Sequence, residues 1–217
     1  MSEQAASRRE TLRRGALAAG ALAAGGLLRP ALAAAQSPDD EDLRDFLVEA
    51  IALEQITVLA YSNAADADRG SKATYERFRD QEQAHANALR QAIDGLGFDA
   101  PDAPDSPTDT GVLDGVDGLD DDAAKRLTER LDSLDKAKTP EQFLDLLNSL
   151  ETEQLTYYAG QGPALDSSDL STTSGEIASC QAQHLVVLGQ AAGHSPGAVA
   201  NSVAGTAAQA GRDTESP

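Results

Sequence analysis

Residues 75–96, YERFRDQEQAHANALRQAIDGL, form a pattern that predicts one helix, and the turn at Gly70 and Ser71 places its start at Lys72. Steps of three or four residues define its inner face, which comprises Tyr75, Phe78, Glu82, His85, Leu89, Ala92 and Leu96. An unpaired ionised carboxylate inside a helical bundle is strongly unfavourable. Glu82, three residues before His85, therefore needs a partner that neutralises its charge, and a metal ion is one candidate.

Three further stretches predict helices whose inner faces also carry polar residues. The first, residues 38–66, has the inner face Leu47, Ala50, Glu54, Val58, Tyr61 and Ala65. The second, residues 139–159, has the inner face Leu144, Leu147, Glu151, Leu155 and Tyr158. The third, residues 169–192, has the inner face Ile177, Gln181, His184, Leu188 and Ala191. Thr139 and Gln142 have the spacing of a capping box, which indicates where the second of these helices begins.

A long connection separates the four helices into two pairs. Residues 97–139 are rich in proline, aspartate and glycine, and within them residues 123–134 predict an amphipathic helix that lies on the bundle. Alanine and leucine dominate the apolar residues, and no stretch shows the sustained polar–apolar alternation of a strand. Two helical hairpins joined by a long crossover predict an all-α, antiparallel four-helix bundle.

The two hairpins repeat one arrangement of polar residues. The first hairpin contributes, in order, Glu54, Tyr61, Glu82 and His85. The second hairpin contributes Glu151, Tyr158, Gln181 and His184. Residues three apart are neighbours on a helix face, so a carboxylate and an imidazole at that spacing can hold one ion together. A carboxylate from a second helix completes each half, and two halves side by side predict a site for two metal ions.

This pattern, over residues 38–192, resembles the ferritin-like domain family, in particular its exported bacterial members with a twin-arginine signal. The resemblance implies a four-helix bundle with a di-iron or di-manganese carboxylate centre. It also implies oxidation of Fe(II) by dioxygen or peroxide, iron storage, or decomposition of peroxide. The metal ligands that it implies are Glu54, Glu82, His85, Glu151 and His184. In that set Glu82 bridges the two ions, Glu54 and Glu151 are terminal carboxylates, and each histidine binds one ion.

Gln181 departs from the family pattern, because a second Glu-x-x-His would place a glutamate there. An amide oxygen is a weaker ligand for a hard cation than a carboxylate and has no charge. We therefore expect one better site at Glu54, Glu82 and His85, and one weaker site at Glu151 and His184 that shares Glu82. The alternative is a non-catalytic scaffold or stress-related envelope protein that has lost its metal site. Whether the protein is an enzyme stays open.

The two tyrosines near this centre have two interpretations each. Tyr61 and Tyr158 either donate hydrogen bonds to the ligand carboxylates, as a second shell of the site, or serve as core aromatics. Cys180 is the one cysteine, and it immediately precedes Gln181. Because one step along a helix changes the face, we expect Cys180 on another face of the helix, as an inert buried thiol.

The first 35 residues have the three parts of an export signal. Arg8 and Arg9 begin a basic segment, residues 15–28 are weakly apolar, and residues 31–35 offer small residues at two A-x-A frames. The paired arginines resemble a twin-arginine signal, which predicts export to the periplasm, cell envelope or outside of the cell. A membrane anchor that stays attached is the alternative. After cleavage we expect no stable membrane association.

The remaining composition limits the partners. The formal charge of −19 argues against binding nucleic acid, whose phosphates require lysine and arginine, and favours attraction of cations. Residues 194–217 lack a core-forming pattern and predict a disordered tail, so the bundle itself is assigned to residues 36–193. Nothing in the sequence indicates a large assembly, and a monomer or homodimer is the expected state.

Overall fold

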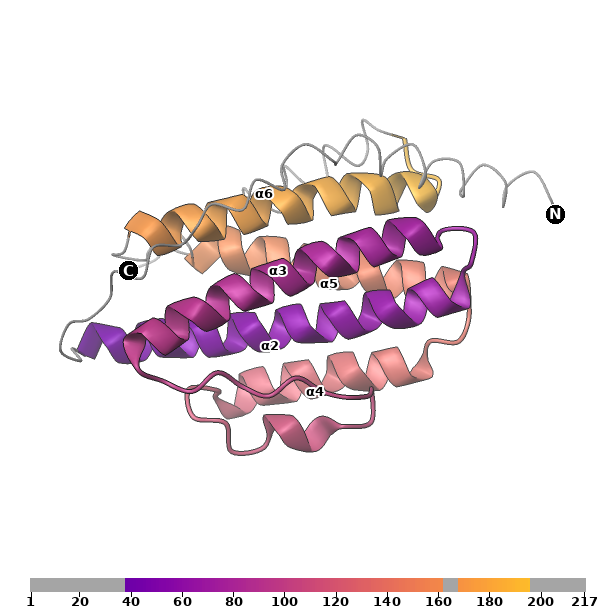
Figure 1. The fold of residues 1–217 in the computed structure, drawn as a ribbon. Helices are drawn as coiled ribbons and strands as arrows, with labels where there is room; N and C mark the ends of the chain where they lie inside the picture. The colour runs from indigo at the N-terminus through magenta and orange to yellow at the C-terminus, as the bar shows by residue number, and fades with distance from the viewer. Residues whose placement is uncertain (1–37, 162–167, 196–217) are drawn as a thin grey trace.

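Five α-helices and no strand occur in the part of the chain that this computed structural model describes, residues 38–161 and 168–195 (Figure 1). The helices are α2 (Pro38–Ala67), α3 (Lys72–Leu96), α4 (Asp121–Lys136), α5 (Pro140–Gln161) and α6 (Ser168–Ala191), with a short 3-10 helix, η2 (Thr110–Leu113). The all-α prediction is confirmed. The predicted signal peptide, residues 1–35, and the predicted tail from residue 196 onward lie outside the described residues.

Helices α2, α3, α5 and α6 form an antiparallel four-helix bundle. Helix α2 pairs with α3 and α5 pairs with α6, while α2 also contacts α5 and α3 contacts α6. In Figure 1, α3 ends at the left of the bundle and α5 begins at its right, so the crossover returns the chain along the whole bundle. The two predicted hairpins are therefore joined as expected by a long connection, and every neighbouring pair of helices is antiparallel.

Capping residues mark where several helices begin and end. Gly97 ends α3 with a left-handed φ of 83°, and its N–H donates to Asp94 O at 3.1 Å. The predicted capping box at α5 is confirmed: the Gln142 N–H donates to Thr139 Oγ1 at 3.3 Å, and the Thr139 N–H donates to Gln142 Oε1 at 3.1 Å. These local signals fix the points at which the chain enters and leaves the bundle.

Helix α4 lies against the outside of α2, as predicted, although it is longer at both ends than residues 123–134. Its buried side chains are Ala123, Leu127, Leu131 and Leu134. Two ion pairs of 2.6 Å fasten it to the bundle, Arg126 with Glu49 of α2 and Arg130 with Glu153 of α5. The crossover therefore covers α2, and it leaves α3 and α6 to close the opposite side (Figure 1).

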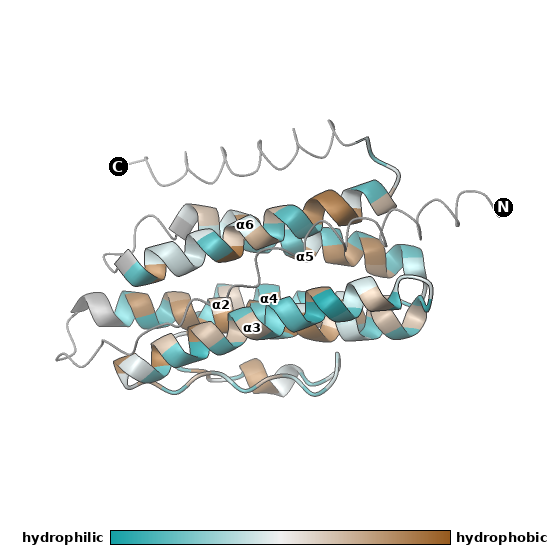
Figure 2. Cartoon of the chain, turned by 45° about the horizontal axis from the view of Figure 1, so that its top comes forward, coloured by the Kyte–Doolittle hydropathy of each residue, from teal (hydrophilic) through white to brown (hydrophobic). Residues whose placement is uncertain are grey.

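The apolar core consists of two clusters of buried side chains. One contains Tyr61, Phe78, Leu147 and Leu188, and the other contains Leu47, Leu89, Tyr158 and Ile177. Between them lie buried polar side chains from all four bundle helices, Glu54, Glu82, Glu151 and His184 among them. In Figure 2 the bundle helices show both brown and teal residues, as amphipathic helices do. No helix among the described residues has the length and apolar character needed to cross a membrane.

Candidate metal centre

The polar residues predicted from the repeat meet in the middle of the bundle. Glu54 comes from α2, Glu82 and His85 from α3, Glu151 from α5 and His184 from α6. The three glutamates and His184 are 0% exposed, and the His85 side chain is 16% exposed. They form two groups of three in which the potential ligand atoms all lie within 4.8 Å of one another. Glu82 belongs to both groups.

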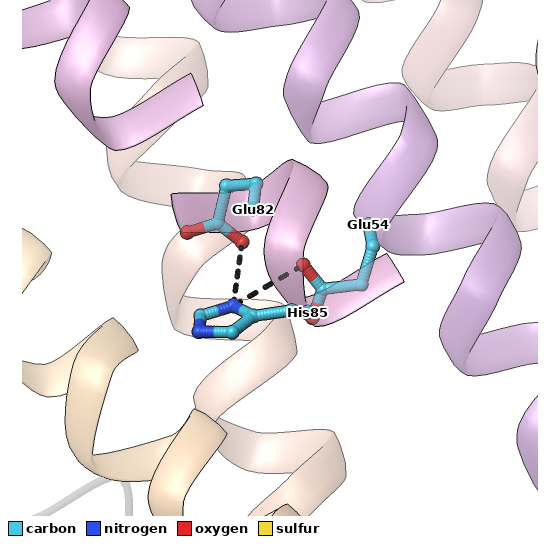
Figure 3. Close-up of side chains that lie close together, drawn as sticks. All are labelled: Glu54, Glu82 and His85. Atoms are coloured by element: carbon cyan, nitrogen blue, oxygen red, sulfur yellow. Dashed lines mark ion pairs between the residues drawn. The ribbon is translucent and has the colours of Figure 1, made fainter. Parts of the chain in front are cut away.

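The first group joins α2 to α3 and contains Glu54, Glu82 and His85. His85 Nδ1 lies 3.5 Å from Glu82 Oε2 and 3.7 Å from Glu54 Oε2 (Figure 3). Figure 3 shows the imidazole nitrogen facing both carboxylates, one from its own helix and one from the neighbouring helix. Two hard oxygen donors and one imidazole are a donor set that suits divalent first-row metals.

The second group joins α3, α5 and α6 and contains Glu82, Glu151 and His184. His184 Nδ1 lies 3.0 Å from both Glu82 Oε1 and Glu151 Oε1. Its ring stacks on Phe78, with centroids 4.0 Å apart and an interplanar angle of 26°, so the imidazole is held in one orientation. The two oxygens of Glu82 therefore face different groups, Oε2 toward His85 and Oε1 toward His184.

Each terminal carboxylate receives a hydrogen bond from a tyrosine of the other hairpin. The Tyr158 hydroxyl donates to Glu54 Oε1 at 2.6 Å. The Tyr61 hydroxyl donates to Glu151 Oε1. Of the two interpretations of these tyrosines, the hydrogen-bonded one describes the structure, and both rings also belong to the apolar core. The second oxygen of each glutamate, Oε2, takes no part in this hydrogen bond.

Two glutamine amides surround the shared carboxylate. Gln181 Nε2 donates to Glu82 Oε2 at 2.9 Å, and Gln154 Nε2 donates to the same oxygen at 3.4 Å. Both glutamines are 0% exposed. Gln181 thus points into the centre, where the repeat predicted it. Gln154 was not predicted, although its position three residues after Glu151 on α5 repeats the spacing between Glu82 and His85 on α3.

Burial and mutual contacts shift the protonation of these groups. Burial raises the pKa of Glu54 well above its ordinary value, and repulsion from Glu82 raises it further. At Glu82 burial acts in the same direction, but the charge of His85 and the close approach of His184 Nδ1 outweigh it, so its pKa lies well below the ordinary value. Burial lowers the pKa of both imidazoles, yet the nearby carboxylates dominate and raise it well above the ordinary value. Protons therefore balance the carboxylate charge of the metal-free centre.

Unpaired polar atoms concentrate in this centre. Among the described residues seven buried side-chain nitrogen or oxygen atoms lack a hydrogen-bond partner, and six belong to the centre. The six are Glu54 Oε2, Glu82 Oε1, His85 Nδ1, Glu151 Oε2, Gln154 Oε1 and Gln181 Oε1. A buried polar atom without a partner costs about 1–3 kcal/mol. Five of the six are oxygens and the sixth is an imidazole nitrogen, so a divalent cation fits the donors that the chain presents.

Two further side chains support His184 from its outer side. The second ring nitrogen, Nε2, lies 3.0 Å from Gln81 Oε1 and 3.6 Å from Cys180 Sγ. The expectation that Cys180 lies away from the centre is wrong. It is one residue from Gln181 but four residues before His184, and residues four apart share a helix face. Gln81 likewise lies four residues before His85, and this spacing was a signal in the sequence that Gln81 lies near the centre.

The hydrogen bond from Tyr158 gives the first testable prediction. Tyr158→Phe removes the donor to Glu54 and lets the carboxylate rotate, so we expect metal affinity to fall about 10–100-fold. Isothermal titration with Mn(II) measures this change. Tyr157→Phe is the matched control, because the neighbouring hydroxyl donates to the Phe46 carbonyl at 3.0 Å and not to the centre. Equal affinities for the two variants would contradict a supporting role of Tyr158.

Comparison with known proteins identifies one family. A family model described as "Ferritin-like domain" matches residues 42–194, which is more than half of the chain. This range contains every residue that the four bundle helices contribute to the centre. Neither the comparison with curated proteins nor the one with solved structures gives a significant match.

Proposed function

The chain belongs to the ferritin-like domain family, and on that premise we propose that it binds iron or manganese in the centre formed by its four bundle helices. The proposed reaction is oxidation of Fe(II) by dioxygen or peroxide, or sequestration of iron. The proposed ligands are Glu54, Glu82, His85, Glu151 and His184, with Glu82 shared between two ions. The first group, which has the complete Glu-x-x-His sequence, is the proposed higher-affinity site.

One observation supports metal binding most strongly: six of the seven unpaired buried side-chain atoms of the described residues gather in the centre. If the bundle bound no metal, hydrophobic side chains of similar volume would fill its interior more favourably than these polar groups. A cation between the carboxylates provides the missing partner for the unpaired oxygens and for His85 Nδ1. The concentration of these atoms thus favours a functional centre over a remnant of one.

The chain's own residues define what the centre can do. A bound iron or manganese ion would supply one-electron redox chemistry toward dioxygen or peroxide. Tyr158 and Tyr61 hold the terminal carboxylates in orientation through their hydroxyls, and Phe78 and Gln81 hold the His184 ring from its face and its outer edge. The two apolar clusters exclude water on both sides of the polar layer. His85, which is partly exposed, marks the side of the centre nearest to solvent.

The proposal includes the place where the protein acts. Residues 1–35 carry the paired arginines Arg8 and Arg9, a weakly apolar segment and two A-x-A frames, and we propose that they direct export by the twin-arginine route. This route carries folded proteins, which agrees with a metal loaded before export. Lysine substitution of both arginines is expected to keep the protein inside the cell, as measured by fractionation.

Metal content after loading tests the proposed function. We expect the purified protein to retain one to two equivalents of Fe(II) or Mn(II) after desalting, and its unfolding temperature to rise on loading because the metal binds the folded state. His85→Ala removes one ligand of the first group and should lower the retained metal by about half. Elemental analysis and calorimetry measure the two effects. Retention by the wild type no greater than by His85→Ala would overturn the proposal.

A non-catalytic scaffold is the second candidate function. The observation that favours it is the hydrogen bond from Gln181 to Glu82, which stabilises the central carboxylate without a metal. A scaffold of this kind would unfold at the same temperature with and without chelator. The loading experiment therefore decides between the two candidates.

A further inference from the structure

Gln154 is the one buried side chain of the centre that neither the internal repeat nor the family pattern places there. It lies on α5 and is 0% exposed, and its amide nitrogen reaches the central carboxylate of Glu82 at 3.4 Å. The repeat pairs Gln154 with Thr57, which is three residues after Glu54 and whose hydroxyl donates to its own helix at Leu53 O. Gln154 is therefore an addition to one half of the centre, with no counterpart in the other half.

Only one of the two polar atoms of the Gln154 amide has a hydrogen-bond partner. Its nitrogen donates to Glu82 Oε2, whereas its oxygen, Oε1, is buried and has no partner. Gln181 shows the same arrangement on the same carboxylate oxygen. Two neutral amides thus converge on one anionic oxygen, and each holds an unpaired carbonyl oxygen inside the bundle. Turning either amide over about its last side-chain bond exchanges its donor for its acceptor.

The spacing around Glu82 Oε2 is that of ligands on a common ion. Three atoms surround this oxygen: Gln181 Nε2 at 2.9 Å, Gln154 Nε2 at 3.4 Å and His85 Nδ1 at 3.5 Å. Two oxygen ligands at right angles on one cation, each about 2.1 Å from it, lie about 3 Å apart. An amide oxygen placed where the nitrogen now lies would therefore be within ligand spacing of Glu82 Oε2.

Charge favours the turned-over amides once a cation is present. When one divalent ion is bound in the first group, the charges of Glu54 and Glu82 together balance it, so this group needs further neutral donors and no further charge. A cation at Glu82 Oε2 repels an amide N–H and attracts an amide oxygen. The weak second half-site, in contrast, has Glu151 and a share of Glu82 as its carboxylates, with His184 as its imidazole. The glutamines therefore complete the first group.

We propose that Gln154 is an additional metal ligand, which together with Gln181 turns its amide oxygen toward a divalent cation held by Glu54, Glu82 and His85. The resulting donor set of two carboxylates, two amides and one imidazole is charge-neutral with Mn(II) or Fe(II). Its four oxygens make it a site for hard cations. In the metal-free protein the same amides donate to Glu82 and hold the carboxylate in position. This inference rests on the proposed function, because it requires the centre to bind a cation.

Mn(II) titration of the purified protein tests the proposal, with free Mn(II) measured by its electron paramagnetic resonance signal. Gln154→Met removes the oxygen but keeps an unbranched side chain, and its soft thioether is a poor ligand for Mn(II). We expect its affinity to fall about 10–100-fold, the range found when groups around a metal site are removed. Gln154→Glu supplies a charged oxygen at the same place and should bind Mn(II) more tightly than the wild type.

Gln55→Met is the matched control. Gln55 is also a buried glutamine, but its amide contacts the crossover at Pro101 O and not the centre, so the substitution should leave Mn(II) affinity unchanged. A Gln154 that only donates to Glu82 would also lose affinity in Gln154→Met, because the freed carboxylate can rotate. The glutamate variant separates the two roles, since a carboxylate that does not bind the ion would repel Glu82 and lower affinity. Affinity of Gln154→Glu at or below that of the wild type, or unchanged affinity of Gln154→Met, overturns the inference while the proposed function stands. No Mn(II) binding by the wild type would instead overturn the proposed function.

Discussion

Replacement of Glu82 by glutamine is expected to abolish metal binding in both groups of the centre. Glu82 is the only residue that belongs to both, and its two oxygens face His85 and His184 separately. A neutral amide in its place removes charge from each site at once, so the loss should exceed the roughly 100-fold that follows loss of a supporting group. Metal retained after desalting, measured by elemental analysis, should fall to the background level.

A matched substitution on the same helix separates this effect from a general change in charge. Glu76→Gln also removes one carboxylate from α3, but Glu76 is partly exposed and its carboxylate lies 3.6 Å from Lys72 Nζ. We expect this variant to retain as much metal as the wild type. Retention by Glu82→Gln at the level of Glu76→Gln would show that the shared carboxylate is not a ligand.

Phe78→Ala is expected to cause the largest loss of stability. The ring is 0% exposed, stacks on His184 and meets the Tyr61 ring edge-on with centroids 5.7 Å apart. Its removal leaves a cavity in one apolar cluster and frees the imidazole, so the free energy of unfolding should fall by about 3–5 kcal/mol. Denaturant unfolding of the metal-free protein measures it. Gln83→Ala, an exposed position on the same helix, should change stability by less than about 0.5 kcal/mol.

A loss below about 1 kcal/mol for Phe78→Ala would mean that the cluster collapses around the missing ring. It would contradict the view that Phe78 fixes the His184 ring. Measurement of Mn(II) affinity in the same variant adds a second test, since an imidazole without its stacking partner should bind the ion more weakly.

The fold was predictable because its helices repeat apolar residues at the helical period over many turns. Residues 75–96 alone indicate a helix and its inner face, and the structure confirms the predicted helix over Lys72–Leu96. Helix ends were less predictable. The helix predicted at 123–134 begins at Asp121, because Asp120 supplies the cap and accepts a hydrogen bond from the Ala123 N–H at 2.6 Å. A cap depends on one side-chain rotamer, which periodicity does not specify.

The centre was predictable where the chain repeats itself and not elsewhere. The repeat pointed to the carboxylates and imidazoles that the structure brings together, whose role as metal ligands stays a prediction. It could not indicate Gln154, which has no counterpart in the first hairpin. Nor could it give the direction of an amide, so Gln181 was considered as a weak ligand and not as a donor to Glu82. The single step from Cys180 to Gln181 predicts different faces of the helix, whereas the four-residue step to His184 places the Cys180 Sγ beside the imidazole.

The polar layer between the two apolar clusters also restricts how the helices can be aligned. A slide of α3 by one turn, about 5.4 Å, would carry Glu82 into an apolar cluster and bring Phe78 or Ala86 between the carboxylates of the neighbouring helices. An ionised glutamate without its partners would then be buried among hydrocarbon side chains. Uniform leucine faces would tolerate such slippage, whereas this bundle has a single register. The same residues that are proposed to hold a metal thus also select a single packing of the two hairpins.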